Sequence, residues 1–232
     1  MEDVWQVNEA IEHSALTEKT YERVRQQILS GRFSAGERLQ ITTVSEQLGV
    51  SHTPVKIALN RLAAEGLVEI VPRRGMFVSR LTREELEETR DVRLLIELHA
   101  VSMAVRNAAG DQLAQLRRQV EHLERMVEWI PTDGWDPVKA AEMNQLFHEM
   151  ILKIVGNRRL LEIWRGLEIQ QQIVRANSQS LSTPPEVVLQ YHRSILEGLE
   201  ARDEERARKA MREHIVHSTD ALAATLEQSV GP

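Results

Sequence analysis

The chain has 232 residues, 42% of them hydrophobic and 28% charged, and it carries a formal net charge of -6 at pH 7. It contains no cysteine, which excludes disulfides and thiolate zinc sites and leaves histidine, carboxylate and amide groups as metal ligands. No apolar run approaches the roughly 20 residues of a membrane span. Residues 1–14 are acidic, whereas a signal peptide would be basic and then apolar, so we expect a cytoplasmic protein with no membrane partner.

Basic residues are concentrated in one part of the chain. Residues 17–80 contain ten Lys or Arg against six Asp or Glu, whereas residues 1–16 and 81–232 are both net negative. The negative total argues against nonspecific coating of nucleic acid, but a locally basic segment can still meet DNA. The length of 232 residues favours two ordinary domains, which we place at residues 1–80 and 81–232, and the charge distribution predicts that any contact with DNA comes from residues 17–80 in the first.

Three helices separated by glycine turns are predicted near the start of the chain. They span residues 17–30, about 42–48, and 51–65, with Thr17 as N-cap of the first and Ser51 as N-cap of the third. A helix, a glycine turn and a second helix is the spacing of a helix-turn-helix.

Two short strands follow the third helix. Residues 67–71 and 76–79 are rich in strand-forming side chains and flank the turn Pro72-Arg73-Arg74-Gly75. This pattern predicts a β-hairpin with a basic tip, where Arg73 and Arg74 could enter or straddle the minor groove of DNA.

The third helix has two different faces. Val55, Ala58, Leu59 and Leu62 lie on the face expected to pack against the first two helices, and the opposite face presents His52, Thr53, Lys56 and Asn60. Free backbone N–H groups and Lys56 near a helix N-terminus favour phosphate, and side chains there can reach base edges. From the pattern alone, an ordinary amphipathic helix with a polar outer face remains the alternative.

From Thr82 onward the pattern changes to long helices with almost no strand signal. Thr82 and Glu85 have the spacing of a capping box that begins the new domain. Proline-containing breaks are expected at residues 131–137 and 181–185. About six helices are predicted, an arrangement typical of an antiparallel bundle, at residues 82–109, 111–129, 137–155, 157–180, 185–200 and 203–228.

Four polar residues of the second domain have a spacing that suggests a metal site. Asn144 and His148 are four residues apart and share one helix face, while His192 and His214 lie on the last two helices. Imidazoles gathered in a bundle core can hold zinc, nickel or a similar divalent ion. Taken singly, each is more often a structural or surface residue, and His99, His122 and His217 are expected at the surface.

The first domain resembles the DNA-binding domain of GntR-family regulators. The matching segments are ILSGRF (28–33), GERL (36–39), LGVSHTPVKIAL (48–59), LAAEGLV (62–68) and RGMFV (74–78). They are ordered and cover about sixty residues.

That resemblance implies a set of DNA contacts. The family usually has arginine where this chain has His52 and Lys56, which changes the expected operator because arginine grips guanine in a bidentate way. The expected DNA-contacting residues are Arg38, Thr42, Thr43, Ser51, His52, Thr53, Lys56, Asn60, Arg73, Arg74 and Gly75.

The second domain resembles the FCD ligand domain of the FadR-type branch of that family. The segments NQLFH (144–148), Gly156-Asn157 and YHRSI (191–195), with the later His214, carry this resemblance. Many members bind a divalent metal through one aspartate and three histidines, often beside an organic acid. Here Asn144 occupies the place of the aspartate, so weaker or different metal binding is expected.

The same resemblance suggests arginines for an anionic effector. It would place Arg93 at the wall of the pocket, and Arg175 is a second candidate. An interior arginine is costly to bury without a partner, so an effector carboxylate could pair with Arg93. Glu97, one helical turn away, is the alternative partner.

The hypothesis from the sequence is a mainly α-helical, DNA-binding transcription regulator with a winged helix-turn-helix and a helical bundle. It is expected to be a repressor, to form a homodimer on a near-palindromic operator of double-stranded DNA, and to respond to a small organic acid. The alternatives are a metal-responsive regulator and a metal-dependent enzyme on a helical bundle. The enzyme is disfavoured because no carboxylate is placed by motif as ligand or general base.

Overall fold

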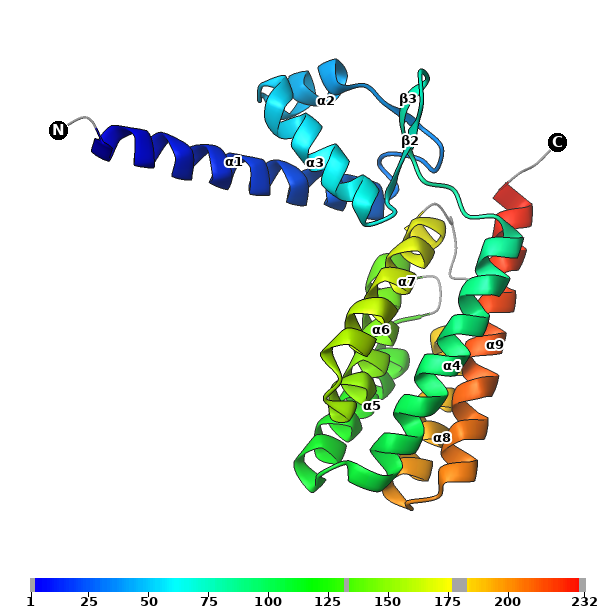
Figure 1. Ribbon diagram of the computed structural model, residues 1–232. Helices are drawn as coiled ribbons and strands as arrows, with labels where there is room; N and C mark the ends of the chain where they lie inside the picture. Colours follow the sequence, from blue (N-terminus) through cyan, green and yellow to red (C-terminus); the bar gives the residue numbers. More distant parts are fainter. Residues whose placement is uncertain (1–2, 132–133, 177–182, 230–232) are drawn as a thin grey trace. The chain divides into compact units, whose positions relative to one another are not determined.

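The computed structural model describes residues 3–131, 134–176 and 183–229 (Figure 1). Contacts within the chain divide it into two compact units, Met1–Arg80 and Leu81–Pro232. We call them the first and second units.

The first unit combines three helices with a small sheet. The strands lie in the order β1-β3-β2, and both pairings are antiparallel. The elements are α1 (Asp3–Leu29), β1 (Arg38–Leu39), α2 (Ile41–Leu48), α3 (His52–Ala64), β2 (Val68–Val71) and β3 (Gly75–Val78). This is a winged helix-turn-helix, and β2, β3 and the turn between them form its wing.

The start of α1 differs from the prediction. The helix begins at Asp3 rather than at Thr17, so Thr17 lies inside it and is not an N-cap. Residues 3–16 contain neither glycine nor proline, so nothing in them stops a helix from continuing. Strand β1 was not predicted either, because two residues are too few for a recognisable alternation.

The helix-turn-helix depends on one backbone conformation that glycine adopts easily. Gly49, the C-cap of α2, has φ 66° and ψ 34°, in the left-handed region. Ser51 occupies the predicted N-cap position of α3, but its side chain forms no capping hydrogen bond. Behind this turn the core of the unit is fully buried and includes Val24, Ile28, Val55, Leu59 and Leu62.

The second unit is an antiparallel helical bundle. In Figure 1 its helices run side by side along one direction. Helix α4 packs against α9, α6 and α7, and α8 packs against α9 and α5. The described residues form α4 (Arg83–Asn107), α5 (Gly110–Trp129), α6 (Pro137–Val155), α7 (Arg158–Ala176), α8 (Pro185–Glu200) and α9 (Glu204–Ser229).

The predicted start of the second unit at Thr82 is confirmed, whereas other predicted helix ends differ or lie outside the described residues. The capping box forms, with the Thr82 hydroxyl accepting from the Glu85 amide at 3.2 Å and the Glu85 carboxylate accepting from the Thr82 amide at 2.7 Å. Gly110, expected to end a helix, instead begins α5. The predicted helix to residue 180 is described to Ala176, and part of the expected break at 181–185 lies outside the described residues.

The bundle has a continuous apolar core. Phe147, Trp164, Ile195, Leu199 and Ile215 are each at most 1% exposed. Within the described ranges, no helix is both long and apolar enough to cross a membrane.

Candidate DNA interface and candidate metal centre

The predicted reading face of α3 is exposed in the first unit. His52, Thr53, Lys56 and Asn60 are all exposed, whereas Val55 and Leu59 on the opposite face are fully buried. The first backbone N–H groups of a helix have no acceptor within it, and Ser51 gives α3 no side-chain cap, so this N-terminus favours anions such as phosphate. The arrangement matches what a recognition helix needs.

Ile57 is a residue of this face that the sequence analysis did not single out. Its side chain is 48% exposed, although isoleucine is usually buried, and it lies four residues after Thr53 and three before Asn60. An apolar side chain among polar ones can contact the C5 methyl group of thymine. The sequence did contain a sign of this exposure, because Ile57 falls outside the helix face formed by the buried residues at positions 55, 58, 59 and 62.

Arg61, the last cation of α3, is engaged with α1. Its Nη1 atom lies 2.6 Å from Oε2 of Glu18, and its guanidinium carbon lies 3.6 Å from the centre of the Tyr21 ring. The Tyr21 hydroxyl in turn donates to the carboxylate of Glu65 at 2.8 Å. These contacts fix the C-terminal end of α3 on α1, so we assign Arg61 to packing rather than to DNA contact.

The wing carries a second group of exposed cations. Arg73 and Arg74 are exposed in its turn, and Arg73 has a positive φ of 65°. Arg38 of β1 pairs with Phe77 of β3, and its guanidinium lies so close to Gly75 that a Cβ there would be 3.3 Å from Nε. Gly75 therefore gives Arg38 room beside the wing turn.

Ten of the eleven predicted DNA-contacting residues are exposed to solvent. The exception is Gly75, which is partly buried; the exposed residues are Arg38, Thr42, Thr43, Ser51, His52, Thr53, Lys56, Asn60, Arg73 and Arg74. Their contact with DNA remains a prediction.

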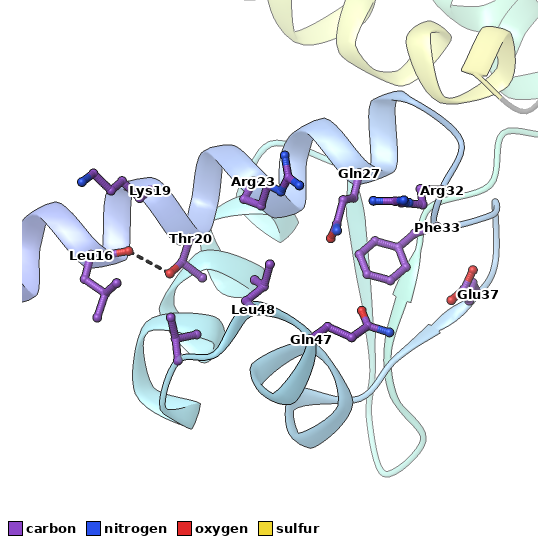
Figure 2. A pocket seen from close by; sticks show the side chains of 11 residues that line it. Leu16, Lys19, Thr20, Arg23, Gln27, Arg32, Phe33, Glu37, Gln47 and Leu48 are labelled. Atoms are coloured by element: carbon purple, nitrogen blue, oxygen red, sulfur yellow. Dashed lines mark hydrogen bonds between the residues drawn. The ribbon is translucent and has the colours of Figure 1, made fainter.

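A separate basic cleft of about 800 Å³ lies in the first unit between α1, the end of α2 and the turn before β1 (Figure 2). Lys19, Arg23 and Arg32 line it together with one carboxylate, Glu37, which lies at the same end as Arg32. The positive charge of this unit is therefore not confined to α3 and the wing.

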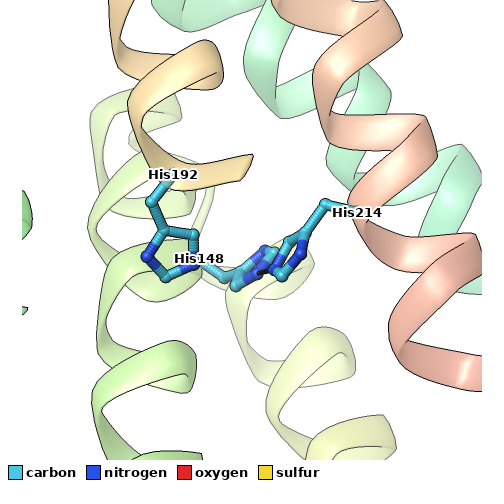
Figure 3. A group of neighbouring side chains, drawn as sticks. All are labelled: His148, His192 and His214. Carbon is cyan, nitrogen blue, oxygen red and sulfur yellow. Dashed lines mark hydrogen bonds between the residues drawn. The ribbon is translucent and has the colours of Figure 1, made fainter. Parts of the chain in front are cut away.

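In the second unit, four polar side chains converge in the bundle core. Asn144 and His148 come from α6, His192 from α8 and His214 from α9, and Figure 3 shows the three imidazoles pointing toward one another. We call these four residues the histidine site. The Oδ1 atom of Asn144 lies 3.1 Å from Nε2 of His192 and 3.0 Å from Nε2 of His214.

The spacing of these atoms suits a metal ion. The Nε2 atoms of His148 and His214 are 3.0 Å apart, and one ligand atom from each histidine lies within 4.8 Å of the others. Ligand atoms about 2.1 Å from a metal lie about 3.0 Å apart in an octahedral site and about 3.4 Å apart in a tetrahedral one. Three imidazole nitrogens and one amide oxygen therefore fit a divalent ion.

Burial keeps two of these histidines neutral. Burial, and after it the neighbouring His148, lowers the pKa of both His192 and His214 well below the usual value. The ring of Phe147 stacks on His192 with centroids 3.9 Å apart and fixes its orientation. Neutral, oriented imidazoles are the form that binds metal.

Glu97 of α4 is the buried carboxylate beside this site. Its Oε2 atom lies 2.5 Å from Nδ1 of His148, and its Oε1 atom accepts from the indole N–H of Trp164 at 2.9 Å. Burial alone would raise the pKa of Glu97, but Arg93, His148 and the Trp164 hydrogen bond together lower it to about 2. Glu97 is therefore an ionised carboxylate in the core.

Arg93 is held by carboxylates rather than open to a ligand. It is 1% exposed, and its Nε atom lies 2.7 Å from Glu97 and 3.1 Å from Glu168. Its Nη1 atom also donates to Gln171 at 3.2 Å. The expectation that Arg93 neutralises an effector is not supported by these surroundings, because its charge is already balanced; the alternative partner, Glu97, is the one observed.

Arg175 lies in α7, but its side chain is outside the described residues, so its contact with an effector stays a prediction. His99, His122 and His217 are exposed, as expected.

Comparison with known families matches both units. Residues 16–78 match the sequence model of bacterial regulatory proteins of the gntR family, and residues 88–217 match that of the FCD domain. The FCD match alone spans more than half of the chain.

Similar proteins align with this chain over nearly their full length. The HTH-type transcriptional regulator YdhC of Bacillus subtilis is 26% identical over 208 residues, covering 90% of this chain and 91% of YdhC. The HTH-type transcriptional repressor RspR of Escherichia coli is 24% identical over 207 residues, covering 89% of both chains. The solved structure of E. coli McbR has a TM-score of 0.70 at 25% identity and covers 92% of this chain and 98% of that one.

Proposed function

This chain belongs to the GntR family of bacterial regulatory proteins and carries an FCD domain, and from this premise we propose that it is a repressor controlled by a small organic acid. It is a DNA-binding transcription regulator, and proteins of this family are not enzymes. The observation that carries the proposal is the pairing of an exposed, basic α3 and wing in one unit with a buried polar site in the other.

DNA reading is assigned to α3 and the wing. Lys56 would meet a phosphate or a guanine edge, His52, Thr53 and Asn60 would reach base edges in the major groove, and Ile57 would contact a thymine methyl. Arg73 and Arg74 would contact phosphate or the minor groove. Exposure of all these side chains supports the assignment.

Recovery of bound DNA from a pool of genomic fragments tests this function. We expect a small set of fragments that share a near-palindromic sequence, whose neighbouring genes indicate the effector. Uniform recovery of all fragments would contradict sequence-specific regulation.

We further propose a homodimer on the operator. One winged helix makes too few phosphate and base contacts for tight specific binding, and a two-fold protein matches a near-palindromic site. Light scattering is expected to give twice the mass of the chain. A monomer at micromolar concentration that still binds its operator tightly and one to one would overturn this assignment.

The histidine site is proposed to hold a divalent ion, zinc or nickel. Asn144, His148, His192 and His214 would be its ligands, and the ion would supply open coordination positions for an effector carboxylate. Binding there would bias the packing of α6, α8 and α9, which contribute the ligands. A regulator that responds to the metal itself is the second candidate, favoured by the burial of all four ligands.

Elemental analysis separates these possibilities. Protein purified without chelator is expected to contain close to one divalent ion per chain, and His192→Ala is expected to lose it while retaining operator binding. Absence of metal after incubation with zinc and nickel would remove the metal from the proposal. A change of operator affinity on chelation alone would favour the metal-responsive regulator.

A further inference from the structure

The hydrogen bonds of Glu97 determine which nitrogen of His148 carries a proton. The Oε1 atom of Glu97 accepts from Nε of Arg93 at 2.7 Å and from the indole N–H of Trp164 at 2.9 Å. The Oε2 atom faces Nδ1 of His148 at 2.5 Å. An ionised carboxylate only accepts hydrogen bonds, so Nδ1 of His148 must donate.

A proton on Nδ1 leaves the other ring nitrogen of neutral His148 with its lone pair. That nitrogen, Nε2, is the atom that faces the histidine site, 3.0 Å from Nε2 of His214. A metal ligand needs this lone pair, and a carboxylate behind the imidazole fixes the tautomer and raises the basicity of the ligand.

Glu97 also brings negative charge to a site that has none of its own. The four residues of the histidine site are three imidazoles and the amide of Asn144, and none of them is an acid. Glu97 is 1% exposed, and its carboxylate contacts the imidazole of His148, one of the four residues of the site. Arg93 pairs with both Glu97 and Glu168, so one negative charge of this group is left over, and it acts through a poorly screened interior rather than through water.

We infer that Glu97 is a positioning residue for the histidine site: it holds His148 as the tautomer with a free Nε2 lone pair and supplies the anionic charge that Asn144 does not. Arg93 and Trp164 hold Glu97 in place. The inference rests on the metal site of the proposed function, but its first test does not require a metal.

Glu97→Gln tests the inference because an amide has different hydrogen-bonding sides. Arg93 and Trp164 can only donate, so the amide oxygen must face them and the amide NH₂ must face His148. Nδ1 of His148 would then accept, and its proton would move to Nε2, where it blocks the ligand lone pair. Glu168→Gln is the matched control, because Glu168 is equally buried and pairs with Arg93 at 3.1 Å, whereas His148 bonds to Glu97.

The first readout is the histidine tautomer in metal-free protein, measured by long-range ¹H–¹⁵N NMR. Wild type and Glu168→Gln are expected to show His148 protonated on Nδ1, and Glu97→Gln to show it protonated on Nε2. The wild-type spectrum alone is decisive if Glu97→Gln does not fold: protonation of His148 on Nε2 in wild type would overturn the inference.

The second readout is zinc affinity in competition with a chromophoric chelator. Glu97→Gln is expected to lose about 10- to 100-fold in affinity, and Glu168→Gln less than about threefold. Adding Asn144→Asp to Glu97→Gln is expected to recover part of the loss by returning a negative charge to the site. Equal losses in the two single variants would show a general effect of the buried ion pairs and overturn the inference.

The two proposals can fail separately. If wild type binds neither zinc nor nickel, the metal part of the proposed function fails, and the tautomer measurement still decides whether Glu97 positions His148. If wild type binds zinc and the tautomer is unchanged in Glu97→Gln, the positioning role fails while the metal site stands.

Discussion

The hydroxyl group of Tyr21 on α1 lies 2.8 Å from the carboxylate of Glu65, the residue that caps the C-terminal end of α3. Through this hydrogen bond and the stacking of Arg61 on the same ring, α1 holds the end of the helix proposed to read DNA. The contact therefore connects the stability of the first unit to the orientation of its reading face.

Tyr21→Phe is expected to destabilise the first unit by roughly 1 kcal/mol, because a partly buried hydrogen bond is lost while the packing of the ring is retained. Denaturant unfolding measures this. Burial, and after it the Glu65 hydrogen bond, raises the pKa of Tyr21 above 10.0. Its contribution is present below pH 10 and is lost as the pH rises through the raised pKa.

An ultraviolet titration provides the check on the pH dependence. The chain has two tyrosines, Tyr21 and Tyr191, so Tyr21→Phe leaves one. In the variant, the part of the tyrosinate absorbance that appears at the highest pH should be missing, because Tyr21 has the raised pKa. The variant should also lose less stability above pH 10 than wild type. Identical alkaline behaviour of the two proteins would contradict the role given to the Glu65 contact.

Ile57→Ala is expected to weaken operator binding about three- to fivefold if the side chain buries one thymine methyl group. Replacing that thymine by deoxyuridine, which lacks the methyl, should weaken wild-type binding by a similar factor. The deoxyuridine change should then have little further effect on Ile57→Ala. Independent, additive losses would indicate that Ile57 does not contact the methyl.

Arg73→Ala combined with Arg74→Ala is expected to flatten the dependence of operator affinity on salt. Two lost phosphate contacts reduce the slope of log affinity against log salt by about two. Arg158→Ala with Arg159→Ala is the matched control, because this neighbouring pair is about 80% exposed but lies in the second unit. An unchanged slope in the wing variant would argue against phosphate contact by the wing.

Gly198→Ala is expected to destabilise the second unit by about 1 to 3 kcal/mol, since overpacking forces helices apart. A Cβ at Gly198 would lie 2.7 Å from the backbone nitrogen of Ala207, where α8 meets α9. Gly166→Ala is the matched control, because a Cβ there meets nothing within 4 Å, and alanine should stabilise α7 by about 1 kcal/mol. Thermal unfolding of the two variants should therefore shift in opposite directions.

Local signals account for the parts of the fold that could be predicted. Helix α8 begins and ends where expected, at Pro185 and Glu200. Its start could be predicted because proline fits the first turn of a helix. The capping box at Thr82 is equally local. The N-terminal half of α1 differs from the prediction because Thr17 has the residue type of an N-cap, although no helix breaker precedes it and the helix continues back to Asp3.

The contacts within the candidate site could not be predicted from local sequence patterns. The four-residue spacing places Asn144 and His148 on one face, but no spacing shows that His192 and His214 converge with them, and the resemblance to the FCD domain strengthened that expectation. The contact between Glu97 and His148 joins residues 51 positions apart in the sequence. No periodicity reports such a contact, and for the same reason Glu97 could be expected only as a local partner of Arg93.

The division of roles between the two units is tested most directly by operator dissociation constants for wild type, Lys56→Ala and His192→Ala, measured by fluorescence anisotropy at one fixed salt concentration. DNA reading is proposed for α3 in the first unit, and ligand sensing for the histidine site in the second. Lys56→Ala should therefore bind roughly five- to 150-fold more weakly than wild type, while His192→Ala should stay within about twofold of it. Wild-type affinity in folded Lys56→Ala would contradict this division of roles.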